Sequence, residues 1–221
     1  TESIPRVPGT SGNGSINGGG SDSSSANIQD EDVPLAGVLP FDDATEANWY
    51  YDAVRYVYEK GLMSGTSDNV FAPHSSTSRA MIVTILYRME GEPEAAASAF
   101  SDVSPDAYYA AAVAWAAENG IVSGYSETQF GPNDNITREQ LAVILYNFAA
   151  FKGLDVTGRA ELESFSDAAQ VSEFAVEALR WAVDAGLMSG VDNVTLAAGG
   201  TATRAQVASL LMRFCENQLA R

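Results

Sequence analysis

The fold is decided by residues 120–146, which read GIVSGYSETQFGPNDNITREQLAVILY. Gly120 follows the last periodic residue of an amphipathic run, and a glycine in that place is typical of a helix end. Turn-rich residues then surround one aromatic anchor, Phe130. Thr137 opens an apolar run and has Gln140 three positions later, which predicts a helix start with a capping box. The stretch therefore predicts a helix end, a turn-rich loop and a second helix.

The same pattern occurs three times. Its markers are a Phe-x-Asp triplet at 41–43, 100–102 and 165–167, a Gly-x-x-Ser-Gly turn at 61–65, 120–124 and 186–190, and a hydroxyl residue followed by arginine at 78–79, 137–138 and 203–204. Copies one and two are 59 residues apart at every marker, and copies two and three are 65 or 66 apart. Such constant spacing indicates an internal repeat, whose small units must pack together to bury a core.

Each copy is predicted to be helix, loop, helix. The first helices are expected over 47–60, 106–119 and 172–185, and the second helices begin at Ser78, Thr137 and Thr203. Apolar residues recur at helical spacing and do not alternate. The second helices are apolar on most faces, so they must be buried against one another. The expected fold class is mainly α, with repeats at 38–96, 97–160 and 161–221.

Residues 1–37 differ from the rest of the chain. They are rich in Gly and Ser and show no apolar periodicity. Such a composition cannot bury enough surface to offset the entropy lost on ordering. A flexible linker is therefore predicted here, and the chain is expected to be part of a longer protein.

The charge balance restricts the possible partners. The net charge is −17, from 29 acidic and 12 basic residues. This argues against nucleic acid, whose binding requires Lys and Arg to neutralise phosphates, and equally against an anionic membrane surface. There is no apolar run near 18 residues, so no membrane insertion is expected.

Signs of catalysis, of a cofactor and of a metal site are missing from the sequence. A Gly-x-Ser-x-Gly elbow, a phosphate-binding loop and a zinc-ligand spacing are all absent. The single cysteine, Cys215, excludes an internal disulfide and is expected to be a small buried core residue. No enzyme, no cofactor and no metal ion are therefore predicted.

The three markers, in this order and three times over, resemble the S-layer homology family. Its repeats also carry an aromatic pair before the first helix, here Trp49-Tyr50 and Tyr108-Tyr109, weakening to Phe174-Ala175. The resemblance covers residues 38–217 and implies a pseudo-threefold assembly with a central helix bundle and inter-repeat grooves. The folded part would then be monomeric, as an intrachain pseudo-trimer.

The resemblance also implies a function. Such repeats anchor a surface protein to the cell wall of Gram-positive-type bacteria by binding the secondary cell-wall polysaccharide, often through a pyruvylated sugar. An extracellular location at the cell wall or S-layer follows. A protein–protein interaction or S-layer self-assembly module that uses the same grooves is the alternative.

Candidate ligand-binding residues follow from the matching motif positions. The family's main ligand contact corresponds to Arg79, Arg138 and Arg204. The other candidates are Asp43, Asp102, Asp167, Trp49, Tyr108, Thr137, Thr203, Gly65, Gly124 and Gly190. For the aspartates a helix-capping role is the alternative. For the aromatic residues and glycines, core packing and a backbone requirement are the alternatives.

The positions of the three arginines are unusual independently of the family resemblance. Each is the first residue of a predicted helix, where a cation is unfavourable by about 0.3–1 kcal/mol. Three such placements predict an anionic ligand, because a guanidinium and helix amides together fit a carboxylate. Alternatively, each arginine pairs with an aspartate of the neighbouring repeat and holds the three units together.

Copy three departs from the pattern, with Ala198-Gly199-Gly200 where the other copies have proline. Its groove is therefore expected to be structural only. From this, Arg138→Ala is predicted to weaken polymer binding more than Arg204→Ala.

Overall fold

The structure, a computed structural model, describes residues 39–192 and 194–219, so the predicted linker at 1–37 lies outside the described residues. The described part contains no strand. Its α-helices are α1 (Tyr51–Glu59), α2 (Arg79–Met89), α3 (Ala110–Glu118), α4 (Arg138–Phe151), α5 (Val176–Asp184) and α6 (Arg204–Phe214). Short turns of 3-10 helix, η1 (Ala168–Gln170) and η2 (Glu173–Ala175), precede α5, and a π-helical turn, η3 (Cys215–Leu219), follows α6. The mainly α fold class is confirmed. None of these helices has the length and apolarity needed to cross a membrane.

The starts of the second helices are confirmed. Ser78, Thr137 and Thr203 are the N-caps, and each hydroxyl accepts a hydrogen bond from the amide three residues later. The capping box is complete in α4 and α6. The first helices begin four residues later than predicted, because the preceding residues form separate turns. In copy one, for example, the amide of Asn48 donates to the carbonyl of Thr45 at 2.8 Å.

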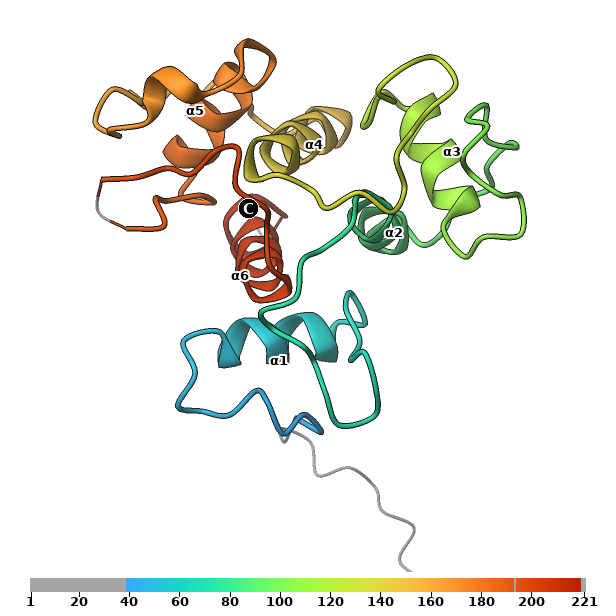
Figure 1. The fold of residues 1–221 in the computed structure, drawn as a ribbon, viewed down its shortest axis with the longest axis horizontal. Helices are drawn as coiled ribbons and strands as arrows, with labels where there is room; N and C mark the ends of the chain where they lie inside the picture. The colour runs from blue at the N-terminus through green and yellow to red at the C-terminus, as the bar shows by residue number, and fades with distance from the viewer. Residues whose placement is uncertain (1–38, 193, 220–221) are drawn as a thin grey trace, which may run out of the picture. The chain divides into compact units, whose positions relative to one another are not determined.

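The closest helix pairs join different repeats. α2 packs against α3, α4 against α5, and α6 against α1. Figure 1 shows α2, α4 and α6 nearest one another, with α1, α3 and α5 outside them. Each second helix therefore covers the first helix of the next repeat, and the α6–α1 pair closes a ring between the two ends of the described chain.

A cycle of backbone hydrogen bonds joins the three repeats. The amide of Thr77 donates to the carbonyl of Ala202 at 3.0 Å, that of Ala202 to Ile136 at 3.0 Å, and that of Ile136 to Thr77 at 2.9 Å. These residues occupy the same position in each copy, just before the N-caps. The closed cycle is consistent with the predicted pseudo-threefold arrangement.

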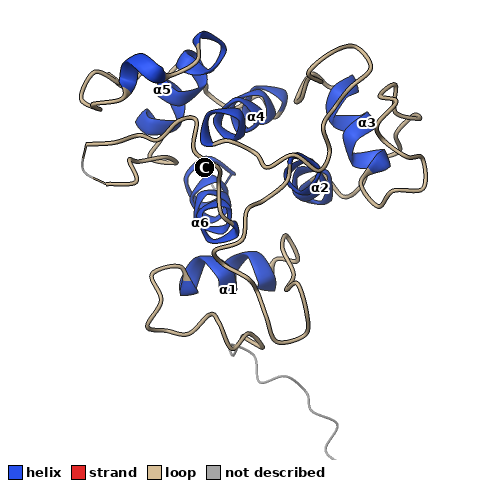
Figure 2. Ribbon diagram, viewed as in Figure 1, coloured by secondary structure: helices blue, strands red, loops and turns tan. Residues whose placement is uncertain are grey.

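The core runs through all three repeats. The predicted loop anchor Phe130 is completely buried, and so are Phe71 and Leu196, the loop anchors at the equivalent positions of the other two copies. Phe148 of α4 and Phe214 of α6 are also buried, with ring centroids 5.8 Å apart. Outside the helices, most of the described residues lie in loops (Figure 2). The helices and anchors therefore supply one continuous apolar core, which a single repeat could not form.

Cys215 differs from its prediction. It is half-buried and packs against the core, because α6 gives way at this residue to the π-helical turn. Burial raises the pKa of its thiol.

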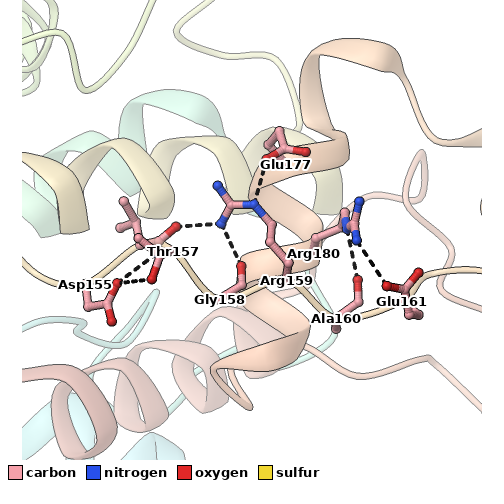
Figure 3. Close-up of polar contacts among 9 residues, drawn as sticks. Asp155, Thr157, Gly158, Arg159, Ala160, Glu161, Glu177 and Arg180 are labelled. Atoms are coloured by element: carbon pink, nitrogen blue, oxygen red, sulfur yellow. Dashed lines mark hydrogen bonds and ion pairs between the residues drawn. The ribbon is translucent and has the colours of Figure 1, made fainter.

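The connection from α4 to α5 is fixed by two arginines (Figure 3). Arg159 Nε donates to Glu177 at 2.6 Å, and Arg180 Nε donates to the carbonyl of Ala160 at 3.1 Å. A terminal nitrogen of Arg180 also pairs with Glu161 at 3.3 Å. The carboxylates of both pairs are exposed, so each pair contributes little to stability. Their effect is to hold the connection against α5.

Candidate functional site

The arginines at the starts of the second helices all make the same two hydrogen bonds. Each donates from Nε to the carbonyl of a loop anchor and from a terminal nitrogen to the carbonyl of the turn serine, always in the next repeat around the ring. The acceptors are Phe130 and Ser123 for Arg79, Leu196 and Ser189 for Arg138, and Phe71 and Ser64 for Arg204, at 2.6–3.1 Å. The arginines therefore join each second helix to the following repeat.

This arrangement revises the hypothesis that each arginine pairs with an aspartate of the neighbouring repeat, whereas an anionic ligand at the arginines stays a prediction. The arginines do bind the neighbouring repeat, but through carbonyl oxygens, and none of the ion pairs within the described ranges joins them to an aspartate. Burial lowers the pKa of all three guanidinium groups. Arginine nevertheless stays charged in proteins. The cost of a cation at a helix start is thus offset by carbonyl dipoles of the same chain.

The aspartates hold the loops that carry those carbonyls. Each carboxylate accepts hydrogen bonds from two consecutive backbone amides at 2.7–2.9 Å. The donors are Phe71 and Ala72 for Asp43, Phe130 and Gly131 for Asp102, and Leu196 and Ala197 for Asp167. The amide of Leu196 is the main cause that holds the pKa of Asp167 below its usual value. The carboxylates thus position the arginine acceptors, and the carboxylate of Asp167, the residue before η1, makes no capping hydrogen bond to that helix.

Three grooves open beside the arginines. Each is lined by one helix-start arginine, by the turn and four second-helix residues of the next repeat, and by one aromatic residue of the third. The Arg79 groove, of about 450 Å³, has turn residues 121–125 and Phe174. The Arg138 groove, of about 220 Å³, has residues 187–191 and Trp49. The Arg204 groove, of about 340 Å³, has residues 62–66, Thr77 and Tyr108. The four helix positions are the same in all three grooves.

The aromatic residues at the grooves are exposed. Trp49 is 67% exposed, Tyr108 66% and Phe174 62%. Core packing, the alternative for Trp49 and Tyr108, is therefore wrong, because the second member of each pair, Tyr50 or Tyr109, packs inward instead. The predicted site omitted Phe174, although its alignment with Trp49 and Tyr108 marks it as the third member of the set.

The remaining candidates divide into two groups. Gly65, Gly124 and Gly190 each line one groove. A Cβ atom at any of them would collide with the backbone of its own turn, so a backbone requirement explains these glycines. Thr137 and Thr203 use their hydroxyls as helix caps and are not among the residues that line the three grooves. A ligand-binding role for these residues stays a prediction.

The three guanidinium groups differ in their aromatic contacts and in their burial. That of Arg79 lies over the rings of Tyr125 and Phe130, 4.6 Å from each centroid. That of Arg204 lies 4.5 Å from the ring of Phe71. Arg138 faces the copy-three loop, which has Val191 and Leu196 at those positions, and it is the least buried of the three.

This placement removes the reason for the predicted ranking of Arg138 above Arg204. The divergent loop of copy three lies against Arg138, whereas Arg204 reaches the loop of copy one. The premise is wrong because each arginine serves the next repeat and not its own.

The grooves are positively charged surfaces on an acidic chain. None of the described residues that line them is acidic, and five arginines do so: Arg79, Arg88, Arg138, Arg204 and Arg213. The whole chain has 29 acidic residues against 12 basic ones. Within the described ranges, no three His, Cys, Asp or Glu residues form a group able to hold a metal ion. The grooves therefore have the chemistry to bind an anion that also presents an apolar face.

The model of the S-layer homology domain matches this sequence at residues 40–80, 99–142 and 164–208. The chain belongs to the S-layer homology family. The matched segments include the three arginines and the three turns, and in copies two and three they also include the first groove-lining helix residues, Gln140 and Gln206.

Relatives of this S-layer homology chain are large proteins. It is 32% identical over 190 residues to the surface-layer 125 kDa protein of Lysinibacillus sphaericus, covering 84% of this chain and 16% of that protein. It is 30% identical over 174 residues to an endoglucanase of Bacillus sp. (strain KSM-635), covering 78% and 18%. An undecaheme cytochrome from the S-layer of Carboxydothermus ferrireducens aligns over 73% of this chain and 20% of the cytochrome, with 19% identity and a TM-score of 0.39. The chain spans less than a fifth of the two sequence relatives.

One buried hydroxyl distinguishes the first S-layer homology repeat. Among the described residues, Thr77 Oγ1 is the one buried side-chain oxygen or nitrogen without a hydrogen-bond partner. The equivalent residues are Ile136 and Ala202, both apolar. Leaving such a group unpaired costs about 1–3 kcal/mol, and an apolar replacement of the same shape is nearly neutral or stabilising.

Thr77→Val is therefore expected to keep the free energy of unfolding or raise it by up to about 1 kcal/mol, measured by urea denaturation. Thr84→Val is the matched control. Thr84 lines the same groove and is buried, but its hydroxyl donates to the carbonyl of Ala80 at 2.8 Å, so a loss of stability is expected there. A Thr77→Val protein as destabilised as the control would mean that the Thr77 hydroxyl has a partner.

Proposed function

We propose that the chain anchors a surface protein to the bacterial cell wall, without catalysis, by binding an acidic, pyruvylated secondary cell-wall polysaccharide in its grooves. The observation that carries the proposal is the repeated combination of an arginine and an exposed aromatic residue in grooves whose described lining has no carboxylate. Membership of the S-layer homology family and similarity to surface-layer and cell-surface proteins support anchoring at the cell surface.

The groove chemistry suits a sugar with a carboxylate substituent. A guanidinium matches the two oxygens of a carboxylate. Each arginine uses Nε and one terminal nitrogen for carbonyls of the chain, which leaves the donors of its other terminal nitrogen for a ligand. A pyruvate ketal supplies the carboxylate, and the ring of Trp49, Tyr108 or Phe174 offers a surface for the apolar face of the sugar. Repulsion by the net charge of −17 is screened beyond roughly 8–10 Å at physiological ionic strength.

The similarity to enzymes does not extend the proposal to catalysis. The endoglucanase is matched over 18% of its length, and an amylopullulanase of Thermoanaerobacterium thermosulfurigenes over 9%. A binding module appended to a separate catalytic domain explains why the match covers so little of each enzyme. For this chain, a binding module is therefore proposed.

Removal of pyruvate from the polymer tests this function. Retention of the protein on protein-free wall polysaccharide is measured before and after mild acid treatment that cleaves the ketal. Affinity is expected to fall at least about tenfold, because each site loses a charge-assisted hydrogen bond. Equal binding to both polymers would exclude the pyruvate group as the ligand. Retention by a purified surface protein, but by neither polymer, would support the self-assembly module instead.

The exposed aromatic residues give a second prediction. Tyr108→Ala is expected to weaken polysaccharide binding about fivefold, since an aromatic contact contributes about 1 kcal/mol. Its unfolding free energy is expected to change by less than about 0.5 kcal/mol, because the side chain is exposed. Tyr58→Ala is the control, since Tyr58 is 40% exposed and lies outside the three grooves. Equal affinities of the two variants would remove Tyr108 from the binding site.

A further inference from the structure

One helix position makes the three grooves unequal. Nine residues after each helix-start arginine stands Arg88 in α2, Asn147 in α4 and Arg213 in α6. Arg88 lines the Arg204 groove, Asn147 the Arg79 groove and Arg213 the Arg138 groove. Two grooves therefore hold two guanidinium groups each, and one groove holds a guanidinium and a neutral amide.

Two of the three side chains at this position, those of Asn147 and Arg213, reach equivalent carbonyls. Asn147 Nδ2 donates to the carbonyl of Ile121 at 3.2 Å, and a terminal nitrogen of Arg213 donates to the carbonyl of Leu187 at 3.5 Å. Ile121 and Leu187 are equivalent residues, each directly after the glycine that ends a first helix. An arginine therefore fits where Asn147 stands, and the difference between the grooves is one of charge.

The second arginines are available to a ligand. Arg213 makes a single long hydrogen bond, which leaves most of its donors unused in the described part of the chain. Arg88 forms an ion pair with Glu92 at 3.9 Å, and both side chains are largely exposed. Such a pair contributes little and is easily exchanged for another anion.

The Arg79 groove is the weakest place for a negative charge. It has no second arginine, and two aromatic rings, those of Tyr125 and Phe130, each lie 4.6 Å from its guanidinium. Arg79 already uses two of its nitrogens as donors to carbonyls. It therefore offers a carboxylate fewer free donors and less positive charge than a pair of arginines does.

We propose that the chain binds the acidic sugar in two of its three grooves, those of Arg138 and Arg204, and that Arg88, Arg213 and Asn147 determine this selectivity. The inference rests on the proposed function. Arg88 and Arg213 each supply the second cation that holds the carboxylate, and Asn147 leaves the Arg79 groove without one.

The test counts sites by isothermal titration calorimetry of the full chain with a methyl hexopyranoside that carries a 4,6-linked pyruvate ketal. Two sites are expected for the unaltered chain. One site is expected for Arg88→Asn and one for Arg213→Asn, with the affinity of the altered groove about ten- to a hundredfold weaker. Asn147→Arg is expected to have three sites. Arg55→Asn, which removes the same charge from a side chain as exposed as that of Arg88 (42%) but outside the grooves, keeps two.

Three equal sites in the unaltered chain would overturn the inference, and so would an unchanged count in both asparagine variants. Two sites in Asn147→Arg would overturn the role assigned to that position, once circular dichroism shows that the variant is folded. A chain that binds neither this glycoside nor the wall polysaccharide would instead refute the proposed function. The two failures are therefore distinguishable.

Discussion

Replacement of Arg204 by alanine is expected to lower the free energy of unfolding by about 3 kcal/mol, although the residue lines a groove. The guanidinium donates to the carbonyls of Phe71 and Ser64 at 2.8 and 2.6 Å, and it lies 4.5 Å from the centre of the Phe71 ring. Its loss leaves two carbonyls without a charged donor and weakens the junction between the last and first repeats. The melting temperature is expected to fall by roughly 6–12 °C.

Two variants serve as controls for the Arg204 prediction. Arg204→Lys is expected to recover only part of the loss, because an ammonium group cannot reproduce the fork that spans both carbonyls. Arg55→Ala is expected to change stability by less than about 0.5 kcal/mol, since Arg55 makes one exposed ion pair within its own helix. A loss below about 1 kcal/mol for Arg204→Ala would mean that the arginine does not hold the repeats together. Urea denaturation followed by circular dichroism measures all three.

The instability expected for Arg204→Ala, and for the equivalent variants, affects how their ligand affinities are interpreted. A variant of Arg79, Arg138 or Arg204 can lose ligand affinity because the groove wall has moved, even if the arginine never touches the ligand. Arg88 and Arg213 lack this second role, since neither bridges two repeats through a described hydrogen bond. They therefore report on ligand charge more directly.

Local signals made the helix ends predictable. A hydroxyl residue followed three positions later by glutamine fixed the starts of α4 and α6. Glycines with positive φ, such as Gly120, ended the first helices as expected. These features depend on hydrogen bonds between residues close in sequence, so the sequence alone contains them.

The order of helix pairing could not be predicted in this way. The pairing of α6 with α1 joins opposite ends of the described chain, and no local pattern distinguishes it from a pairing of α1 with α2. The wrong ranking of Arg138 above Arg204 has the same cause. The sequence does not show whether an arginine hydrogen-bonds to the next repeat or to its own.

The candidate site was predictable in part. The unfavourable helix-start position of Arg79, Arg138 and Arg204 correctly indicated that something offsets their charge. Carbonyl oxygens do so within the chain, and a carbonyl leaves no mark in a sequence because every residue has one. Arg88 and Arg213 can be read from the sequence, but only the groove geometry distinguishes them from ordinary exposed arginines.

Truncation after Thr203, which removes α6, is expected to unfold α1 at the other end of the chain. Val54 and Val57 of α1 are completely buried, and α6 is the helix against which α1 packs. Without α6 these valines face water, at a cost of about 1.5–3 kcal/mol for each side chain. Hydrogen exchange followed by mass spectrometry is expected to show at least a thousandfold loss of protection in α1, or about 4 kcal/mol.

α3 is the internal control for the truncation, because its partner α2 remains in the shortened chain. It is expected to keep more protection than α1, although the cycle through Ala202 is weakened. Independent repeats in linear order would give the opposite result, since the loss of α6 would then affect only copy three. Protection of α1 that survives the truncation would therefore contradict ring closure, whereas its selective loss would mean that the first repeat completes its fold only when the last one is present.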